Sequence, residues 1–551
     1  MTASASPSIA EVLAARAGDE RPGLVLDDQR WTWAEVVAES AARAAVLEEL
    51  GAGQGRHVGV LLPNTPEFVF LLGGAALAGK VIVGVNPTRR GEELARDIRH
   101  TDCCVVLTDR AQAALLDGLD LGGAVVHVVD EPGWHERLGA HRGAALPADL
   151  PGPDALYLLI FTSGSTGAPK AVQMSQGRAA RTASNGAVGF SPDDVLYCAM
   201  PLFHGNALLA CLFPAMVSGA SVVLRERFSA SAFLPDVRRH GCTYFNYVGR
   251  ALSYVLAQPE TPDDADNQLK FCLGSEASPR DRHEFRRRFG CYVVEGYSSS
   301  EGGVVIQPFS GMPKEALGRP AEGVDVAVID PDTGEECRRA QFGPDRQLLN
   351  AAEAIGEIVG RDGLSSFEGY YANPEATAER GRNGWFWTGD LGYRDEEGTF
   401  YFAGRTADWL RVDGENFAAG PVEAVLGRFP GVASVVVYGV PDPRTGDQVM
   451  AAVELDAGAS FDPDAFDAFL AEQPDLGTKW APRFVRVVSA IPVTATGKVD
   501  RKPLRAQRWT TTDPVWWRPS AGQPYRRLTD EDVDGLRQAF ADAGREAVLQ
   551  A

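Results

Sequence analysis

The chain has 551 residues, of which 45% are hydrophobic and 23% are charged, and its formal net charge is −21. This length exceeds what one hydrophobic core usually supports, so we expect two or more domains, and the composition excludes an intrinsically disordered chain. The acidic excess argues against nucleic acid or an anionic membrane as the main partner, so an anionic ligand would need locally placed cations.

The N-terminal residues 1–20 have neither a basic start nor an apolar core, so we predict no secretory signal. The most apolar stretch, residues 68–85, is interrupted by glycines and Lys80. This favours a buried helix and strand over a transmembrane segment and leaves peripheral membrane contact open. The eight cysteines form no CxxC pair, and Cys103 and Cys104 are adjacent. Such spacing is typical of a reducing compartment rather than of a disulfide or zinc framework, so we predict a cytoplasmic protein.

Helices and strands alternate along the first part of the chain. Residues 32–51 show helical apolar spacing that ends at Gly51, and a second apolar helix is predicted over residues 67–79. The predicted strands are residues 57–63, 81–87, 103–109, 124–130, 194–200 and 221–226. This alternation is expected of mostly parallel sheets covered by helices.

A further apolar run, residues 156–161, ends in a loop of small hydroxyl residues, glycines and one lysine. Backbone amides freed by two glycines, the hydroxyls and the lysine ammonium could together wrap a polyphosphate. The residues concerned are Thr162, Ser163, Gly164, Ser165, Thr166, Gly167 and Lys170. A Walker loop needs glycine before the lysine, and Pro169 stands there instead, so this is a different phosphate loop. A Ser/Gly-rich surface linker is the other interpretation, but linkers rarely follow a strand that reads as buried.

Two later loops carry groups suited to a nucleotide. An apolar strand ends at Gly274, Ser275 and Glu276, whose backbone could lie against a flat heterocycle, although a plain turn explains the pattern equally well. Residues 293–303 supply an aromatic that could stack on a base, a hydroxyl that could contact a phosphate and a carboxylate that could hold Mg²⁺. These are Tyr297, Ser300 and Glu301. Taken alone, such a glutamate is more often simply solvated.

After about Val324 the strands shorten and turns become denser, which predicts an antiparallel β subdomain, and a further α/β unit begins near Gly404. Asp390 lies in a tight Thr-Gly-Asp turn and Arg405 follows a strand. An aspartate can bridge both ribose hydroxyls, and an arginine can bind the ribose or an adjacent phosphate. A turn aspartate and a solvated arginine are the structural alternatives.

Lys498 follows a glycine in a Thr-rich turn, where it is either a mobile charge suited to a developing pyrophosphate or a solvated lysine. The last forty residues, from about Trp509, contain a predicted amphipathic helix in which Thr529 and Asp532 resemble a capping box.

Five segments carry these candidate residues: the loop after residue 161, the turn at 274–276, residues 293–303, the stretch with Asp390 and Arg405, and the turn at Lys498. They occur in the order and approximate spacing of the adenylate-forming superfamily of acyl-CoA synthetases, luciferases and nonribosomal peptide adenylation domains. The chain resembles this superfamily over roughly residues 10–510. The segments "FEGYYANPEATAER" and "GRTADWLRVDGENFAAGPVE" look most like actinobacterial fatty acyl-CoA synthetases related to fatty-acid transport proteins and very-long-chain synthetases.

The resemblance implies an α/β fold with a large N-terminal domain of two stacked α/β subdomains plus a β subdomain, followed by a small mobile α+β domain. The expected boundaries are residues 1–403 for the N-terminal domain with the ATP and acyl sites, 404–510 for the mobile domain, and 511–551 for an extension that packs on the protein.

The resemblance also implies a two-step reaction that uses ATP and Mg²⁺, with CoA as co-substrate. A carboxylate attacks the ATP α-phosphate to give an acyl-adenylate and pyrophosphate, and a thiol then displaces AMP to form a thioester. Positioning and cations should supply most of the catalysis, because charge accumulates around phosphorus in the first step. The mobile domain is expected to bring Lys498 in for adenylation and then to rotate, so that the loop around Gly414 lines the thiol path.

Motif matching assigns a role to each residue. The loop from Thr162 to Gly167, with Lys170, would hold the phosphates, and Gly274 to Glu276 with Tyr297 would hold the adenine. Ser300 would contact a phosphate oxygen, Glu301 would hold Mg²⁺, Asp390 and Arg405 would bind the ribose region, and Lys498 would bridge the carboxylate and the phosphate.

His204 matches a segment that lines the acyl site in relatives, where it could contact the substrate carboxylate or gate the thiol tunnel, and a buried structural histidine is the alternative. The segment from Thr243 should run along the acyl pocket. Asn246 and Tyr247 in it would need hydrogen-bond partners if buried.

Three departures from the family pattern leave alternatives open. In the first, Ser298 stands where the family has glycine, and Ser300 stands where it has threonine. In the second, Ala171 stands where the family has a glycine after the loop lysine. In the third, Ala407 occupies the hinge position. Some proteins that resemble this superfamily activate nitrite instead of a carboxylate, converting an aryl amine to a diazo group or nitrosating a hydrazine. Transfer to a carrier-protein thiol and a catalytically silent acyl-binding or uptake protein are further alternatives. Acid identity and oligomeric state are not readable from the sequence.

Overall fold

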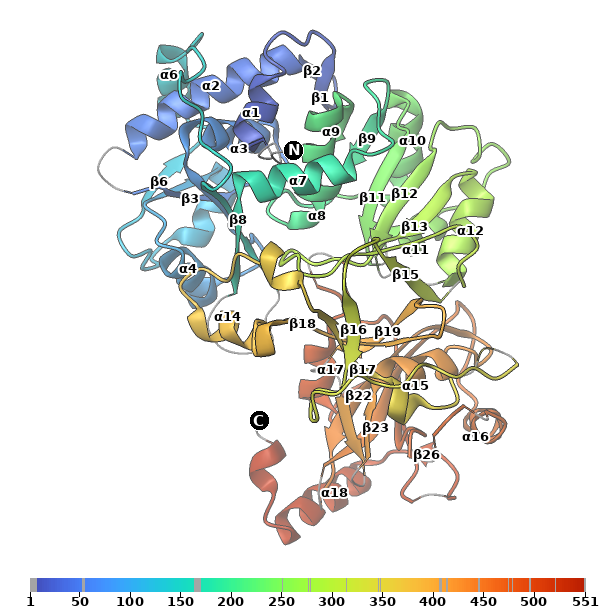
Figure 1. The fold of residues 1–551 in the computed structure, drawn as a ribbon. Coiled ribbons are helices and arrows are strands. Elements are labelled where there is room, and N and C mark those ends of the chain that lie inside the picture. The colour runs from blue at the N-terminus through green and yellow to red at the C-terminus, as the bar shows by residue number, and fades with distance from the viewer. Residues whose placement is uncertain are drawn as a thin grey trace. The chain divides into compact units, whose positions relative to one another are not determined.

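The computed structural model describes residues 7–51, 55–162, 170–249, 251–275, 277, 279–313, 315–344, 346, 348–405, 409–412, 415–443, 446–473, 475–477, 479–494, 497–520 and 522–549. The chain divides into two compact units, each described by itself below (Figure 1). The first unit contains residues 1–305 and 363–384, and the second contains residues 306–362 and 385–551. These units differ from the predicted domains, whose boundaries at 403/404 and 510/511 stay a prediction.

The first unit is built on two sheets. One has the strand order β13-β12-β11-β9-β10-β1-β2 and the other has the order β6-β5-β3-β4-β7-β8. All neighbouring strands in them are parallel except the β1/β2 and β7/β8 pairs, which agrees with the predicted alternation. The strands are β1 (Pro22–Leu26), β2 (Gln29–Thr32), β3 (His57–Leu61), β4 (Val81–Gly84), β5 (Val105–Thr108), β6 (Val125–Val128), β7 (Leu156–Phe161), β8 (Ala171–Ser175), β9 (Val195–Cys198), β10 (Ser221–Leu224), β11 (Tyr244–Val248), β12 (Phe271–Ser275) and β13 (Tyr292–Glu295).

Helices cover these sheets, and their ends follow local sequence signals. Thr32 caps the predicted long helix α2 (Trp33–Leu50) in a capping box with Glu35, and Gly79 ends α3 (Pro66–Ala78) at φ 61°, a left-handed conformation that glycine adopts without strain. The other helical elements are α1 (Ile9–Ala14), α4 (Gly91–His100), α5 (Arg110–Ala113), η1 (Ala114–Leu116), α6 (Pro132–Ala140), α7 (Gln176–Gly186), α8 (Gly205–Ala207), the π-helical turn η2 (Leu208–Leu212), α9 (Phe213–Ser218), α10 (Ala230–His240), α11 (Ala251–Leu256), α12 (Pro279–Phe289), η3 (Gly363–Ser366), α14 (Pro374–Arg380) and η4 (Arg382–Gly384).

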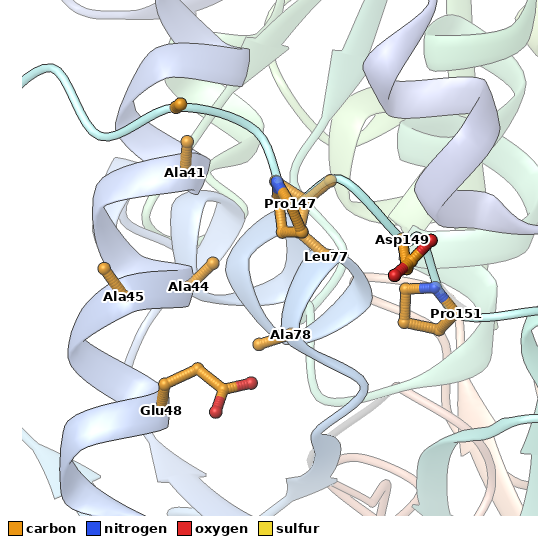
Figure 2. Close-up of a pocket in the computed structure, with 10 residues that line it drawn as sticks. Ala41, Ala44, Ala45, Glu48, Leu77, Ala78, Pro147, Asp149 and Pro151 are labelled. Atoms are coloured by element: carbon orange, nitrogen blue, oxygen red, sulfur yellow. The ribbon is translucent and has the colours of Figure 1, made fainter.

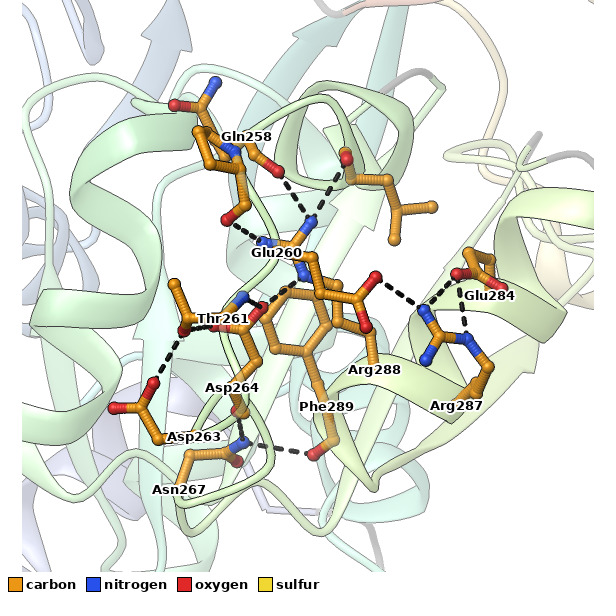
Figure 3. Close-up of polar contacts among 12 residues, drawn as sticks. Gln258, Glu260, Thr261, Asp263, Asp264, Asn267, Glu284, Arg287, Arg288 and Phe289 are labelled. Atoms are coloured by element: carbon orange, nitrogen blue, oxygen red, sulfur yellow. Dashed lines mark hydrogen bonds and ion pairs between the residues drawn. The ribbon is translucent and has the colours of Figure 1, made fainter.

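A buried ion pair holds the long loop between α11 and β12 against α12 (Figure 3). Nε of Arg288 lies 2.5 Å from Oδ2 of Asp264, and both side chains are almost fully buried. The remaining guanidinium hydrogens donate to the carbonyl oxygens of Leu256, Gln258 and Pro259 at 2.7–3.1 Å. Burial opposes ionisation of Asp264, but hydrogen bonds from Thr261 and Arg288 outweigh it and lower the pKa of this carboxyl. The network therefore fixes the entry to β12.

The second unit contains the antiparallel sheet that the short strands and dense turns predict. Its order is β14-β15-β19-β18-β17-β16, and every pair in it is antiparallel. The strands are β14 (Ile306–Gln307), β15 (Ala316–Pro320), β16 (Val326–Ile329), β17 (Gly356–Gly360), β18 (Phe386–Arg394) and β19 (Phe400–Arg405), with the short helix α13 (Ala351–Ala354).

The second unit also holds a two-stranded ribbon and a five-stranded sheet. The ribbon pairs β20 (Trp409–Val412) with β21 (Glu415–Ala418). The sheet has the order β22 (Val432–Pro441), β23 (Asp447–Leu455), β24 (Phe484–Val488), β25 (Val515–Trp517), β26 (Arg526–Arg527). Its helical elements are α15 (Ala419–Leu426), α16 (Pro463–Ala471), α17 (Arg501–Gln507), α18 (Asp530–Asp542) and η6 (Glu546–Leu549).

The last forty residues are part of this sheet. They contribute β25 and β26, and Phe540 of α18 is fully buried beside Trp509, with ring centroids 6.3 Å apart. The predicted capping box of α18 is confirmed, because Thr529 and Asp532 exchange both side-chain to backbone hydrogen bonds. None of the helices in the described ranges has the length and apolar character needed to span a bilayer.

Candidate functional site

The predicted phosphate loop connects β7 to β8. The backbone N–H of Thr162 donates to the carbonyl oxygen of Lys170 at 3.1 Å, so the two ends of the loop are joined directly after Phe161 and directly before Ala171. Residues 163–169 lie outside the described residues, and with them Ser163, Gly164, Ser165, Thr166 and Gly167. The Lys170 ammonium lies 4.0 Å from Oε2 of Glu379 and 5.8 Å from the centroid of the Tyr370 ring.

Glu301 is buried, with 7% of its surface exposed, next to this loop's downstream strand. Its Oε1 accepts a hydrogen bond from the Tyr370 hydroxyl at 2.9 Å, and Nε of Arg380 donates to the same hydroxyl oxygen at 3.2 Å. Tyr370 forms a bridge with Val172 of β8, so the segment 363–384 places this tyrosine beside the loop. Glu301 and Lys170, predicted from separate motifs, are therefore both brought to one tyrosine.

A buried arginine on α7 holds the backbone at the same place. Arg178 donates to the carbonyl oxygen of Ser300 at 2.5 Å and to that of Gln173 at 3.0 Å. Burial lowers the pKa of this guanidinium, and the carboxylates of Glu368 and Glu301 oppose that shift. Glu368 in turn accepts from the backbone N–H and the hydroxyl of Ser175, the residue that caps α7.

Sequence reasoning did not single out Tyr370, Arg178 or Arg380. Tyr370 and Arg380 lie in "FEGYYANPEATAER", which contributed only to the family resemblance. The two adjacent tyrosines between Gly369 and Pro374 are a weak local signal. The partner of Tyr370, Glu301, is 69 residues away in the chain, so no nearby residue marks the contact.

Gly274, Ser275 and Tyr297 come together at the carboxyl ends of two neighbouring parallel strands. Gly274 of β12 pairs with Glu295 of β13, and the N–H of Gly296 donates to the carbonyl oxygen of Gly274 at 3.0 Å. The carboxyl edge of a parallel sheet is the usual place for a ligand. A Cβ on Gly274 would lie 2.5 Å from the Tyr247 ring, so only glycine fits there. Glu276 lies outside the described residues.

The two polar residues of β11 do find partners. The hydroxyl of Tyr247 donates to Oε1 of Glu295 at 2.6 Å, and that oxygen also accepts from the N–H of Ala277 at 3.2 Å. Nδ2 of Asn246 donates to Oδ1 of Asn206 at 2.7 Å. Asn246 is completely buried, and within the described chain its Oδ1 has no hydrogen-bond donor.

His204 stands directly before α8, with its ring centroid 4.4 Å from that of Phe203. The next residue, Gly205, lies against Ser300, because a Cβ on this glycine would be 2.9 Å from the Ser300 hydroxyl oxygen. The segment that carries His204 therefore reaches the loop that carries Ser300 and Glu301. The π-helical turn η2 follows, and such turns are common at functional sites.

Asp390 and Arg405 lie in the second unit, directly opposite each other in the β18/β19 ladder. Thr388 accepts from the N–H of Asp390 at 3.1 Å, and the buried Glu357 accepts from the N–H of Gly389 at 2.6 Å, which fixes the tight turn predicted there. The side chain of Arg405, and Gly414 as a whole, lie outside what the structure describes.

Lys498 ends a tight turn between the bridged residues Val493 and Val499. Its N–H donates to Oγ1 of Thr494 at 3.2 Å, and its carbonyl oxygen accepts from the N–H of Thr494 at 2.7 Å. Gly497 has φ 82°, so the turn requires glycine directly before the lysine. Lys498 itself is half-buried.

The described residues contain no cluster of three or more His, Cys, Asp and Glu side chains that could hold a metal ion. Glu301 alone fits a Mg²⁺ ion nevertheless, because Mg²⁺ usually binds through one or two carboxylates together with substrate phosphates and water. The cavity of about 230 Å³ between α2, α3 and residues 145–151 is a separate feature, lined mainly by alanines and prolines with Glu48 and Asp149 at its edge (Figure 2). None of the predicted site residues lines it.

The chain is similar to a known enzyme family, to named relatives and to solved structures. Residues 11–371 match the family of AMP-binding enzymes, and residues 421–498 match the AMP-binding enzyme C-terminal domain. Steroid-22-oyl-CoA synthetase of Rhodococcus jostii is 53% identical over 549 residues, covering 98% of this chain and 99% of the relative. The medium/long-chain-fatty-acid–CoA ligase FadD17 of Mycobacterium tuberculosis is 46% identical over 517 residues, covering 93% of this chain and 98% of the relative. The crystal structure of ATP-bound MatB from Rhodopseudomonas palustris superposes with a TM-score of 0.79 at 25% identity, covering 90% of this chain and 98% of that one.

Proposed function

The chain belongs to the AMP-binding enzyme family, and we propose that it is an ATP-dependent, AMP-forming ligase that joins a carboxylic acid to CoA. The observation that carries this proposal is the near full-length match to two relatives that are named CoA synthetase or CoA ligase. The family assignment agrees with the resemblance read from the sequence, and the α/β fold agrees with the fold of the solved relative.

In the proposed first step, a carboxylate oxygen attacks the α-phosphorus of ATP, the bond to the bridging oxygen breaks, and pyrophosphate leaves. In the second step, the CoA thiol loses its proton and attacks the acyl carbon, and AMP leaves. The enzyme would accelerate the first step by holding the reactants in line and by placing cations that stabilise the charge growing around phosphorus. A Mg²⁺ ion, when bound, would neutralise part of the polyphosphate charge, and Glu301 is the residue proposed to hold it.

The roles of the other residues remain part of the proposal. Lys170 and the loop before it would contact the phosphates, and Gly274, Ser275 and Tyr297 would form the adenine site at the carboxyl edge of β12 and β13. Asp390 and Arg405 would bind the ribose region, and Lys498 would act on the reacting oxygens. His204 would border the acid, because its neighbour Gly205 lies against Ser300.

We propose a large apolar acid as substrate, either a medium- or long-chain fatty acid or the side-chain carboxylate of a steroid. The names of the two relatives support this class. A cytoplasmic location and the use of CoA rather than a carrier-protein thiol belong to the same proposal.

Pyrophosphate release from ATP tests the proposal directly. The protein is incubated with Mg²⁺, ATP and CoA and with one acceptor at a time from a panel of fatty acids, steroid carboxylates, aryl acids and nitrite with an aryl amine. Release that requires an acid, together with a thioester product, supports the ligase. Release that requires nitrite and consumes the amine would replace it by nitrite activation, and no release with any acceptor would favour a silent acyl-binding protein.

The two half-reactions separate the role of Lys498. We expect Lys498→Ala to lose acyl-adenylate formation by several orders of magnitude while still converting a supplied acyl-adenylate and CoA into thioester. Lys502→Ala, a substitution of the same kind in the following helix α17, is the control and should leave both steps unchanged. Equal loss of both half-reactions in Lys498→Ala would contradict the assigned role.

A further inference from the structure

Tyr370 contacts two charged residues of the first unit that belong to the proposed nucleotide site, Glu301 and Lys170. Its hydroxyl donates to Oε1 of Glu301 at 2.9 Å, and its ring centroid lies 5.8 Å from the Lys170 ammonium. We infer that Tyr370 is a positioning residue that orients the Glu301 carboxylate toward Mg²⁺ and holds Lys170 toward the phosphates. This inference rests on the proposed function and adds a residue to it.

The bond to Tyr370 leaves one side of the Glu301 carboxylate available. Among the described residues, Oε2 of Glu301 receives no hydrogen bond, whereas Oε1 has the tyrosine. A donor at one oxygen fixes the plane of a carboxylate and presents the other oxygen in a single direction. Such an outer hydrogen bond is the usual means by which a protein orients a metal ligand.

The tyrosine is suited to keep its proton while it donates. Only 3% of its surface is exposed, and a tyrosine hydroxyl ordinarily loses its proton only near pH 10, about three units above neutral. Arg380 donates to the same oxygen from Nε at 3.2 Å, which polarises the O–H toward the carboxylate. The hydroxyl therefore acts as a donor to Glu301 across the physiological pH range.

The backbone around Tyr370 is held firmly enough for this role. The N–H of Tyr370 donates to Oγ1 of Thr377 at 2.9 Å, and the N–H groups of Gln173 and Tyr371 bond to the carbonyl oxygens of Gly369 and Ala171 at 3.0 and 2.8 Å. These bonds attach the segment to the edge of β8, directly after the phosphate loop. The same segment supplies Glu379, 4.0 Å from the Lys170 ammonium.

The next residue offers a matched control. Tyr371 also lies at the edge of β8, but its hydroxyl donates to Oδ2 of Asp102 at 2.7 Å, away from Glu301. Replacing either tyrosine by phenylalanine removes one hydroxyl and the one hydrogen bond that this hydroxyl donates to a carboxylate. Only the Tyr370 bond involves a residue proposed to hold the metal.

Binding of Mn²⁺ in place of Mg²⁺, followed by electron paramagnetic resonance in the presence of ATP, tests the inference without turnover. We expect Tyr370→Phe to weaken Mn²⁺ binding in the ATP complex by about 10-fold or more, the range typical of lost outer-shell hydrogen bonds. ATP binding measured by calorimetry in EDTA should stay within twofold of the wild type, because the ring beside Lys170 is kept. Tyr370→Leu, which removes the ring as well, should weaken ATP binding in EDTA too, and Tyr371→Phe should match the wild type in both assays.

A double-mutant cycle separates a specific effect of Tyr370 on Glu301 from a general loss of folded structure. In a Glu301→Gln background, Tyr370→Phe should have no further effect on Mn²⁺ binding, since the carboxylate that it orients is gone. If Tyr370→Phe melts below the assay temperature, Arg380→Gln replaces it and should weaken Mn²⁺ binding in the same direction. Equal Mn²⁺ affinity in Tyr370→Phe and Tyr371→Phe, or an equal loss in both backgrounds, would overturn the inference.

The outcome also separates this inference from the proposed function. A wild-type protein that makes thioester while Tyr370→Phe binds Mn²⁺ normally would overturn the positioning role alone. A wild-type protein that binds Mn²⁺ with ATP, and loses this in Tyr370→Phe, but forms no acyl-adenylate would refute the ligase and keep the positioning role. A wild-type protein that binds no Mn²⁺ with ATP would overturn both.

Discussion

Asp97 in α4 is a buried carboxylate whose ionisation works against folding. It is completely buried, its ion-pair partner is Arg89 with Nε 2.9 Å from Oδ2, and burial raises its pKa to about 6 despite that cation. A folded-state pKa above the unfolded value means that the folded protein binds the proton more tightly. The stabilising effect of the neutral form is therefore complete below about pH 4 and is lost as the pH rises through 6.

We expect Asp97→Asn to remove this pH dependence. Relative to the wild type, the variant should gain up to about 3 kcal/mol of unfolding free energy between pH 4 and pH 7, because two pKa units correspond to roughly that amount. Urea unfolding at a series of pH values measures the difference. A difference that stays constant from pH 4 to pH 7 would show that Asp97 does not titrate in this range.

Gly274 gives a second prediction at the scale of one residue. A Cβ at this position would lie 2.5 Å from two ring carbons and from the carbonyl oxygen of Tyr247, and a backbone oxygen cannot move aside without disturbing β11. We expect Gly274→Ala to cost about 1–3 kcal/mol of stability and to weaken ATP binding at least 10-fold. Calorimetric titration with ATP is the measurement, and Gly296→Ala is the control, since its Cβ would meet only Leu273 at an ordinary 3.6 Å. Normal ATP affinity in Gly274→Ala would show that the carboxyl end of β12 is not part of the proposed nucleotide site.

At the scale of elements, the loop between α11 and β12 depends on one buried ion pair. Removing Arg288 would leave the Asp264 carboxylate buried without its cation and three carbonyl oxygens without donors. Breaking a buried pair on one side typically costs about 3–5 kcal/mol, so Arg288→Met should lower the unfolding free energy by that amount.

The neighbouring arginine serves as the control for this prediction. Arg287 pairs with Glu260 and Glu284 in largely exposed positions (Figure 3), and exposed pairs contribute little. Arg287→Met should therefore leave the denaturant midpoint unchanged. If the two variants unfold at the same denaturant concentration, the buried network does not stabilise the entry to β12.

Many elements could be predicted from the sequence because their signals are local. Thr32 and Glu35 start α2, Gly79 ends α3, and Thr529 and Asp532 start α18, each through contacts within a few residues. The predicted strands are short apolar runs between turns, and a sheet buried on both faces requires such runs. The antiparallel character of the sheet from β14 to β19 could be predicted from the short strands and dense turns in that part of the chain.

The arrangement of the candidate site could be predicted only in part. Residue types in five separate segments indicated a nucleotide, but the order β13-β12-β11-β9 that places Gly274 beside Glu295 depends on tertiary packing. The contacts of Tyr370 with Glu301 and of Arg178 with Ser300 join positions 69 and 122 residues apart, and no local pattern marks them. For Tyr247 the sequence predicts only that the hydroxyl needs a hydrogen-bond partner if it is buried, and it does not identify Glu295 as that partner.

At the scale of the whole molecule, binding of nucleotide should raise stability, since a ligand that binds only the folded state shifts unfolding by mass action. At an ATP concentration about 100 times its dissociation constant, with Mg²⁺, the expected gain is about 2.7 kcal/mol for the part of the protein that holds the nucleotide. Differential scanning calorimetry with and without the nucleotide is the measurement. Because multidomain proteins can unfold in more than one step, each transition is followed separately.

Glu301→Gln serves as the comparison for this experiment. It should reduce the Mg²⁺-dependent part of the shift and leave the shift with ATP in EDTA unchanged. No shift of any transition in the wild type at saturating ATP and Mg²⁺ would contradict nucleotide binding altogether.

The return of residues 363–384 to the first unit has a consequence for synthesis on the ribosome. The nascent chain has completed every strand of both sheets of that unit by residue 295, but the tyrosine that bonds to Glu301 emerges 69 residues after it. At about 5–20 residues per second, this delay lasts on the order of 3–14 seconds. During that interval the edge of β8 and the Glu301 carboxylate are without their final partners. The part of the proposed nucleotide site around Glu301 is therefore completed only after part of the second unit has already been translated.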